Sequence, residues 1–287
     1  MGCRHRRHAH REAPVFRTRK GVKMKERDGV QGENQKAAHE DAKTGKERKG
    51  SGDRWRIGVM GLSPGAGASL ITACLAAFLA EEGKGTVAVA ELGTGGLYDS
   101  LGMAGRFALR EFHSFYKAVK GDVNLRRVKN EEGGINWALK RPEERGEILD
   151  YRPALRLIYG ISGDVALFDF SGRADEEAWR LLREMDVALS VIDPMPSRLM
   201  ANYGTLERWK LSGLPIRYII NKDNRGIGKK ELDRFLRLKT AARIPFLDPE
   251  LLYAAEFNGK NPYRMEGLRI ILEPVFRQVL EGAFPDC

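Results

Sequence analysis

The sequence predicts an α/β protein built on a doubly wound, mostly parallel sheet with helices on both faces. From about residue 53 onward, short and nearly continuous apolar runs alternate with amphipathic segments. Such runs are typical of strands that are buried on both faces between crossover helices. A glycine-rich turn (61–69) joins the first apolar run to a helical segment, and doubly wound folds bind ligands at such turns.

The expected elements follow one another through short connections, as βαβ units require. Continuous apolar runs predict strands at 56–60, 86–92, 134–139, 164–170, 187–193 and 216–221. Helical spacing of apolar residues predicts helices at about 67–82, 107–119, 152–160, 174–184, 197–211, 229–239 and 265–282. The polar region 121–150 predicts loops around a single strand. We therefore expect one domain over residues 53–287.

The last expected helix (265–282) has its apolar residues on one face and charges of both signs on the other. Helices that bind membrane surfaces carry mainly Lys and Arg on the polar face. The pattern therefore predicts a terminal helix that packs against the domain. No apolar run of the sequence is long enough to span a bilayer, so we expect no transmembrane segment.

Residues 1–52 are expected to form a basic, disordered leader. Positions 1–50 hold 15 Lys and Arg against 7 Asp and Glu, which leaves 34 of the 49 basic and 32 of the 39 acidic residues for the rest. Few large apolar side chains occur there, so burial cannot offset the entropy lost on ordering. The alternative to a merely solvated leader is weak contact with nucleic acid or an anionic membrane. Met24 is a second candidate start, which would leave residues 1–23 untranslated.

The glycine-rich turn has the features of a phosphate-binding loop. Gly65 and Gly67 allow positive φ and a close approach of backbone N–H groups to an anion. The helix that begins near Ala68 adds its unpaired N–H groups and its dipole, and the Ser69 hydroxyl can bind phosphate or Mg²⁺. In the pattern G-x-x-x-x-G-K-[ST], however, Leu62 replaces the first glycine and Ala68 replaces the lysine. The alternative is a tight β–α turn that binds nothing.

Taken together, several segments of the chain resemble the MinD/ParA family of deviant Walker ATPases. The segments, in chain order, are SPGAGASL (63–70), VAVAEL (87–92), DVALFDFSGR (164–173), DVALSVIDPMPSRLMAN (186–202), LPIRYIINKDN (214–224) and ARIPFLDPELLYAAEFNGKNPY (242–263). The first stands where the family has K-G-G-x-G-K-T-T. Order and spacing agree over about residues 55–263, and this collinearity is more specific than any single motif.

The resemblance implies a site for ATP or ADP with Mg²⁺. It places the phosphates on the loop residues Gly65, Ala66, Gly67, Ala68 and Ser69. It places the metal on Ser69 and Asp169. Asn221 is assigned to the adenine base, and Pro245 is added to the cofactor-binding residues.

The chain departs from the family at the groups that perform the chemistry. Ser63 stands where the family has the signature lysine that reaches across a nucleotide-sandwich dimer, and Ala68 stands at the loop lysine. Glu91 is kept, but Gly93 stands where a second acid often lies. We therefore assign no catalytic residue. The pattern resembles a degenerate member of the TadZ/CpaE kind, which acts in pilus assembly and polar localisation.

The expected function is that of a bacterial pseudo-ATPase: a nucleotide-binding adaptor for positioning or assembly that hydrolyses very slowly or not at all. One alternative is a working ATPase that takes a lysine from elsewhere, such as Lys84 or Lys222, or from a partner subunit. Another alternative is a scaffold that binds proteins without nucleotide. We expect protein partners, with a homodimer among them, and a cytoplasmic location or one peripheral to the membrane or nucleoid.

Overall fold

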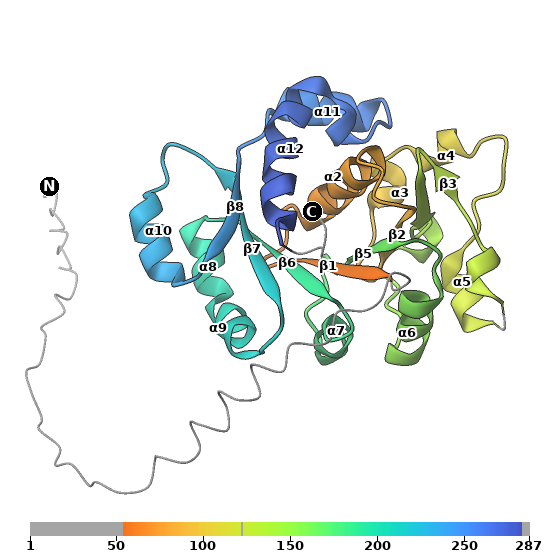
Figure 1. Ribbon diagram of the computed structural model, residues 1–287, viewed down its shortest axis with the longest axis horizontal. Helices are drawn as coiled ribbons and strands as arrows, with labels where there is room; N and C mark the ends of the chain where they lie inside the picture. Colours follow the sequence, from red (N-terminus) through yellow and green to blue (C-terminus); the bar gives the residue numbers. More distant parts are fainter. Residues whose placement is uncertain (1–53, 122, 283–287) are drawn as a thin grey trace, which may run out of the picture. The chain divides into compact units, whose positions relative to one another are not determined.

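The computed structural model describes residues 54–121 and 123–282, so the expected leader lies outside the described residues. Within them the chain forms an eight-stranded sheet in the order β3-β4-β2-β5-β1-β6-β7-β8 (Figure 1). Neighbouring strands are parallel except for β3 and β4. The strands are β1 (Trp55–Gly61), β2 (Val87–Glu91), β3 (Glu131–Glu132), β4 (Ile135–Ala138), β5 (Val165–Asp169), β6 (Val187–Ile192), β7 (Ile216–Asp223) and β8 (Thr240–Pro245). The predicted α/β fold is confirmed.

Helices cover both faces of the sheet, and each interface has its own buried apolar cluster (Figure 1). On one face lie α2 (Ala68–Glu81), α3 (Leu97–Ser100), α4 (Met103–Arg106), α11 (Pro249–Phe257) and α12 (Glu266–Leu280). On the other lie α5 (Phe115–Lys120), α6 (Tyr151–Gly160), α7 (Glu176–Leu182), α8 (Pro196–Ala201), α9 (Tyr203–Leu211) and α10 (Lys229–Leu236). Side chains alternate along each strand: in β6, Leu189 faces the first cluster and Ala188 the second. This two-sided burial explains the continuous apolar runs.

The expected helix at 107–119 is wrong in its first half. The Ser114 hydroxyl accepts a hydrogen bond from the N–H of Lys117 (3.0 Å), so α5 begins only at Phe115. Before it, Phe107 and Phe112 pack edge to face with their ring centroids 5.0 Å apart. The apolar residues that indicated a helix therefore form an aromatic cluster within a loop.

Other differences follow from local chemistry. The expected helix at 197–211 is split into α8 and α9, where the Asn202 side chain donates to the carbonyl of Arg198 (2.9 Å) and competes with the helical pattern. In region 121–150 the structure adds β3, which joins β4 through Gly133 and Gly134, both at positive φ. Edge strand β8 and helix α11 were not predicted. The described residues also form three short 3₁₀ helices: η1 (Leu125–Arg127), η2 (Pro142–Glu144) and η3 (Pro262–Arg264).

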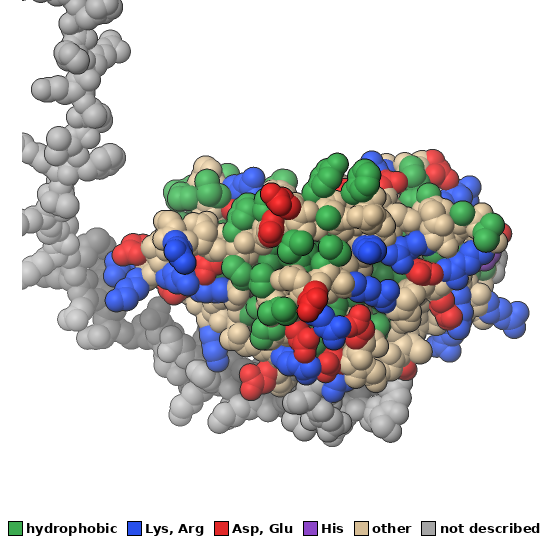
Figure 2. Space-filling model, turned by 90° about the horizontal axis from the view of Figure 1, so that it is seen from above, with side chains coloured by type: hydrophobic (Ala, Val, Ile, Leu, Met, Phe, Trp, Pro, Cys, Tyr) green, Lys and Arg blue, Asp and Glu red, His purple; other side chains and the backbone are tan. Residues whose placement is uncertain are grey.

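Helix α12 packs against the domain, as predicted, and one of the elements it contacts is α2. Its Leu272 and Phe276 are buried, and its Arg277 pairs with Glu82 at the end of α2 (Nη2 to Oε1, 2.7 Å). Figure 2 looks onto this side of the molecule and shows charges of both signs between apolar side chains. Within residues 54–121 and 123–282, no helix is long and apolar enough to cross a membrane.

We expect Phe276→Ala to lower the free energy of unfolding by about 3–5 kcal/mol, because it leaves a cavity between α12 and α2. The Phe276 ring lies 5.7 Å from that of Phe78 and 6.1 Å from that of Tyr263 (centroid distances). Urea unfolding followed by circular dichroism measures the change. Ile270→Ala on the exposed face of the same helix is the matched control and should change it by less than about 0.5 kcal/mol. Equal losses in both variants would contradict the packing described.

Candidate functional site

The loop between β1 and α2 presents backbone rather than side chains at the carboxyl edge of the sheet. Gly65 (φ 73°) and Gly67 (φ 100°) both adopt the left-handed region that glycine allows. Ala66 and Ala68 are buried, whereas Gly65 is exposed. The loop thus has the expected geometry for bringing N–H groups close to an anion.

Helix α2 begins without a side-chain cap and without an acidic residue in its first turn. The first backbone bond runs from the N–H of Ile71 to the carbonyl of Gly67 (3.0 Å). The N–H groups of Ala68, Ser69 and Leu70 precede that bond and have no acceptor within the helix. An uncapped N-terminus keeps the positive end of the helix dipole available to an anion.

The predicted metal residues lie together beside the loop. Asp169 ends β5, the neighbour of β1, and it is 2% exposed. Burial raises the pKa of Asp169, against hydrogen bonds that the hydroxyls of Ser171 and Ser69 donate. Its register partner on β2 is Glu91, so two carboxylates end adjacent strands. Carboxylate and hydroxyl oxygens suit Mg²⁺, and Ser69 and Asp169 are therefore the residues that could hold it.

Asn221 fastens the loop to β7. Its Nδ2 donates to the carbonyl of Ala66 (2.8 Å), and its Oδ1 accepts from the N–H of Lys222 (2.9 Å). A Cβ at Gly67 would overlap the Asn221 amide, so this position needs glycine for space as well as for its φ. Pro245 ends β8 at the same carboxyl edge, but two strands, β6 and β7, separate it from β1.

A charged cluster of Lys222, Asp193 and Arg198 lies against the loop, and of these three residues the sequence suggested only Lys222. Lys222 donates from Nζ to the carbonyl of Gly65 (2.7 Å) and to Asp193 Oδ2 (2.9 Å), and Arg198 pairs with the same oxygen. Burial acts to raise the pKa of Asp193, but the hydrogen bond from Lys222 and the charges of both cations lower it. Lys84, the other lysine considered for the missing charge, follows the far end of the 14-residue helix α2. At 1.5 Å per residue it is roughly 20 Å from the loop.

The loops after β2 and β5 approach each other too closely for a side chain at Gly93. The N–H of Gly93 donates to the carbonyl of Asp169 (2.8 Å), and a Cβ there would overlap the carbonyl oxygen of Ser171 and lie 2.7 Å from its nitrogen. The acid that the family often has at this position cannot be accommodated without moving the backbone. The glycine is thus explained by backbone packing.

A buried acid and a buried lysine hold the same loops in place. Glu91 accepts from the N–H groups of Leu97 and Lys140 (2.8 Å each), and the Lys140 ammonium donates to the carbonyls of Gly93 and Glu147. Burial raises the pKa of Glu91 to about 7 and lowers the pKa of Lys140 to about 8. Both side chains form their hydrogen bonds with backbone groups, so Glu91 has a structural role in this arrangement.

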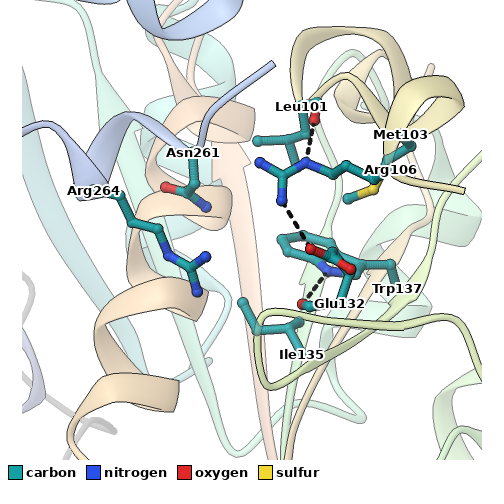
Figure 3. Close-up of a pocket in the computed structure, with 8 residues that line it drawn as sticks. All are labelled: Leu101, Met103, Arg106, Glu132, Ile135, Trp137, Asn261 and Arg264. Atoms are coloured by element: carbon teal, nitrogen blue, oxygen red, sulfur yellow. Dashed lines mark hydrogen bonds and ion pairs between the residues drawn. The ribbon is translucent and has the colours of Figure 1, made fainter. Parts of the chain in front are cut away.

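Two cavities lie elsewhere in the described residues, away from the glycine-rich loop. One cavity has a volume of about 10 Å³. Arg106 pairs there with Glu132 (3.1 Å), and Arg264 and Asn261 approach from the other side (Figure 3). That volume fits about one water molecule. A cavity of about 330 Å³, lined by Lys129 and Asn136 among others, lies near the amino end of β2. Neither includes a residue of the glycine-rich loop.

The fold and this loop define a class of α/β proteins with a mostly parallel sheet. In this class a glycine-rich turn follows the first strand at the carboxyl edge of the sheet and leads into a helix. Solved structures with this fold include a ParA family ATPase from Chlorobium tepidum TLS (TM-score 0.64, 16% identity, 78% of this chain and 98% of that one). The MinC:MinD complex of Aquifex aeolicus has a TM-score of 0.61 and 17% identity, and the match covers 80% of this chain and 97% of that one. MinD complexed with Mg-ADP from Pyrococcus horikoshii OT3 has a TM-score of 0.58 and 19% identity, and the match covers 80% of this chain and 96% of that one.

The chain therefore has the fold of the MinD/ParA ATPases. No protein-family model matches it, and no curated protein matches it in sequence. At 16–19% identity the likeness concerns the fold alone.

We expect Gly93→Ala to lower the free energy of unfolding by at least about 2 kcal/mol, because the added methyl group displaces the backbone of Ser171. Gly204→Ala is the matched control: it lies in α9 with open space around it and should be neutral or stabilise by up to about 1 kcal/mol. Urea midpoints of the two variants provide the comparison. A neutral Gly93→Ala would refute the close approach.

The raised pKa of Glu91 predicts a pH dependence of stability. Between pH 4.5 and about 7 the folded chain holds the Glu91 proton that the unfolded chain has lost, so the contribution of Glu91 falls as pH rises through this window. The total fall is roughly 3 kcal/mol. We expect Glu91→Gln to remove it, as measured by urea unfolding at a series of pH values. Identical slopes for the wild type and the variant would show that Glu91 does not titrate there.

Proposed function

We propose that this chain binds ATP or ADP with Mg²⁺ at residues 65–69 and acts as a positioning or assembly adaptor that hydrolyses nucleotide very slowly or not at all. The observation that carries the proposal is the uncapped N-terminus of α2 behind a left-handed Gly67. Fixed N–H groups of this kind bind phosphate in many nucleotide sites. The structures of similar fold include one with Mg-ADP.

The proposed site uses the residues that the structure brings together. Gly65, Ala66, Gly67, Ala68 and Ser69 would hold the phosphates, and Ser69 with Asp169 would hold the metal. Asn221 uses one N–H and one lone pair in its contacts with Ala66 and Lys222. An amide has two of each, so Asn221 retains donor and acceptor capacity for a base, with Pro245 farther along the edge.

The missing cations support binding without turnover. The loop lysine neutralises charge that develops on the transferred phosphoryl group, and both Ala68 and Ser63 lack any charge. The loss of one charge-assisted contact costs on the order of 1.5–3 kcal/mol in binding, and the cost to the transition state is larger. Gly93 adds no carboxylate to orient water. These departures also support a degenerate, TadZ/CpaE-like role.

An adaptor of this kind needs partners. The Aquifex aeolicus structure holds MinD with MinC, and we propose protein partners and a homodimer for this chain as well. The basic leader adds weak attraction to nucleic acid or anionic membrane, in keeping with a cytoplasmic protein that works at the membrane or nucleoid. A scaffold that never binds nucleotide is the alternative if the loop proves empty.

A second candidate, a working ATPase, is favoured by one contact: Lys222 Nζ lies 2.7 Å from the carbonyl of Gly65. Calorimetric titration of the full chain with Mg-ATP, followed by a phosphate-release assay on the same sample, separates the candidates. Binding without release supports the adaptor. Repeated turnover by the unmodified chain would establish the ATPase, and no binding at millimolar ATP would leave the scaffold.

We expect Ala68→Lys to tighten Mg-ATP binding by about 10- to 100-fold, because it returns a cation to the phosphate loop. Phosphate release should stay at background, since Gly93 still offers no carboxylate. Ala80→Lys adds the same charge near the other end of α2 and should leave affinity unchanged. Equal affinities for Ala68→Lys and the wild type would argue against phosphate binding at this loop.

A further inference from the structure

The end of β7 is shaped so that a lysine reaches the glycine-rich loop from outside it. The pairing of β7 with β8 is irregular between Ile220 and Asp223, and Lys222 within that stretch has a φ of 61°. A left-handed backbone is uncommon for a residue other than glycine, and irregularities of this kind re-aim side chains. Here the result is a Lys222 side chain whose Nζ reaches the carbonyl of Gly65 (2.7 Å).

The cluster around Lys222 leaves an excess of positive charge beside the loop. Lys222 and Arg198 share one carboxylate, that of Asp193, which is 2% exposed and held in place by the N–H of Met195 (3.1 Å). A Cβ built on Gly65 would lie 3.6 Å from Arg198 Nη1, so both cations border the exposed part of the loop. Two cations on one acid leave a net charge of +1.

The Lys222 ammonium also has an unused donor. An ammonium group has three N–H bonds, and the carbonyl of Gly65 and the carboxylate of Asp193 take two of them. Its side chain is 33% exposed and therefore open to a ligand from solvent. Inside the loop, Ser63 Oγ is buried without a hydrogen-bond partner, which adds an unsatisfied donor where the family has its signature lysine.

We propose that Lys222 supplies, from β7, the positive charge for phosphate that Ala68 removes from the loop. The ligand group is the terminal phosphate of a nucleotide or another polyphosphate. Fastening the loop does not by itself require a cation, because Asn221 already holds it through the carbonyl of Ala66. This inference rests on the proposed nucleotide site and names a further binding residue within it.

The test is calorimetric titration of the full chain with two probes, Mg-ATP and inorganic tripolyphosphate. Lys222→Met should weaken binding of both by about 10- to 100-fold, whereas Lys222→Arg, which keeps the charge, should stay within about 3-fold of the wild type. Lys229→Met is the matched control: Lys229 pairs with Asp223 (3.2 Å) and should not affect binding. Asp193→Asn removes the competing carboxylate and should tighten binding. A merely structural cluster would instead weaken binding in both Lys222→Met and Asp193→Asn.

Labelling of the wild-type chain keeps the inference testable if a variant fails to fold. Acetylation of lysines with and without tripolyphosphate, read by mass spectrometry, should show protection of Lys222 but not of Lys229. Equal labelling with and without a bound probe overturns the inference, as does a folded Lys222→Met that binds as tightly as the wild type.

The outcomes also separate this inference from the proposed function. Mg-ATP binding that is unaffected in Lys222→Met overturns the role of Lys222 and leaves the nucleotide site standing. Tripolyphosphate binding that depends on Lys222, in a chain that does not bind Mg-ATP, overturns the nucleotide site and leaves the role of Lys222 in phosphate binding standing. A wild-type chain that binds neither probe overturns both.

Discussion

The parallel register of β2, β5 and β1 is the constraint on which the rest of the site depends. Because these adjacent strands end at one edge, Glu91, Asp169 and the glycine-rich loop lie side by side although about 80 residues separate the first two along the chain. The carbonyl of Asp169 accepts from both Leu92 and Gly93 (2.8 Å each), which joins the loops after β2 and β5. The backbone pairing of the strands thus fixes where Glu91 and Asp169 lie, independently of their side-chain contacts.

The positive charges beside the loop come from neighbouring elements. The loop keeps its glycine geometry and free N–H groups but has no cation of its own, while Lys222 and Arg198 approach it from β7 and α8. Lys140, a buried lysine near the acids, donates to backbone carbonyls. The loop therefore presents backbone N–H groups to an anion, whereas Lys140 is engaged in holding the structure.

Much of the fold could be predicted because two-sided burial leaves a strong pattern, as in β5 and β6, where every residue is buried. The glycine-rich turn before α2 could be predicted as well, from Gly65, Gly67 and Ser69. Edge strand β8 could not be predicted, since its residues TAARIP are only partly buried. The cluster of Asp193, Arg198 and Lys222 was also out of reach, because it depends on the irregular end of β7 and on a contact 157 residues apart.

The position of Gly93 limits which side chains the loop after β2 can carry. A lysine can be introduced at Ala68 by one substitution, but an acid at position 93 meets the backbone of Ser171, whose carbonyl accepts from the N–H of Thr94 (2.9 Å). An acid there would require both loops to move, and Lys140 anchors one of them through the carbonyl of Gly93. Under the proposed function, partners would recognise bound nucleotide at the carboxyl edge of the sheet, where the partly exposed Lys222 lies beside the exposed Gly65.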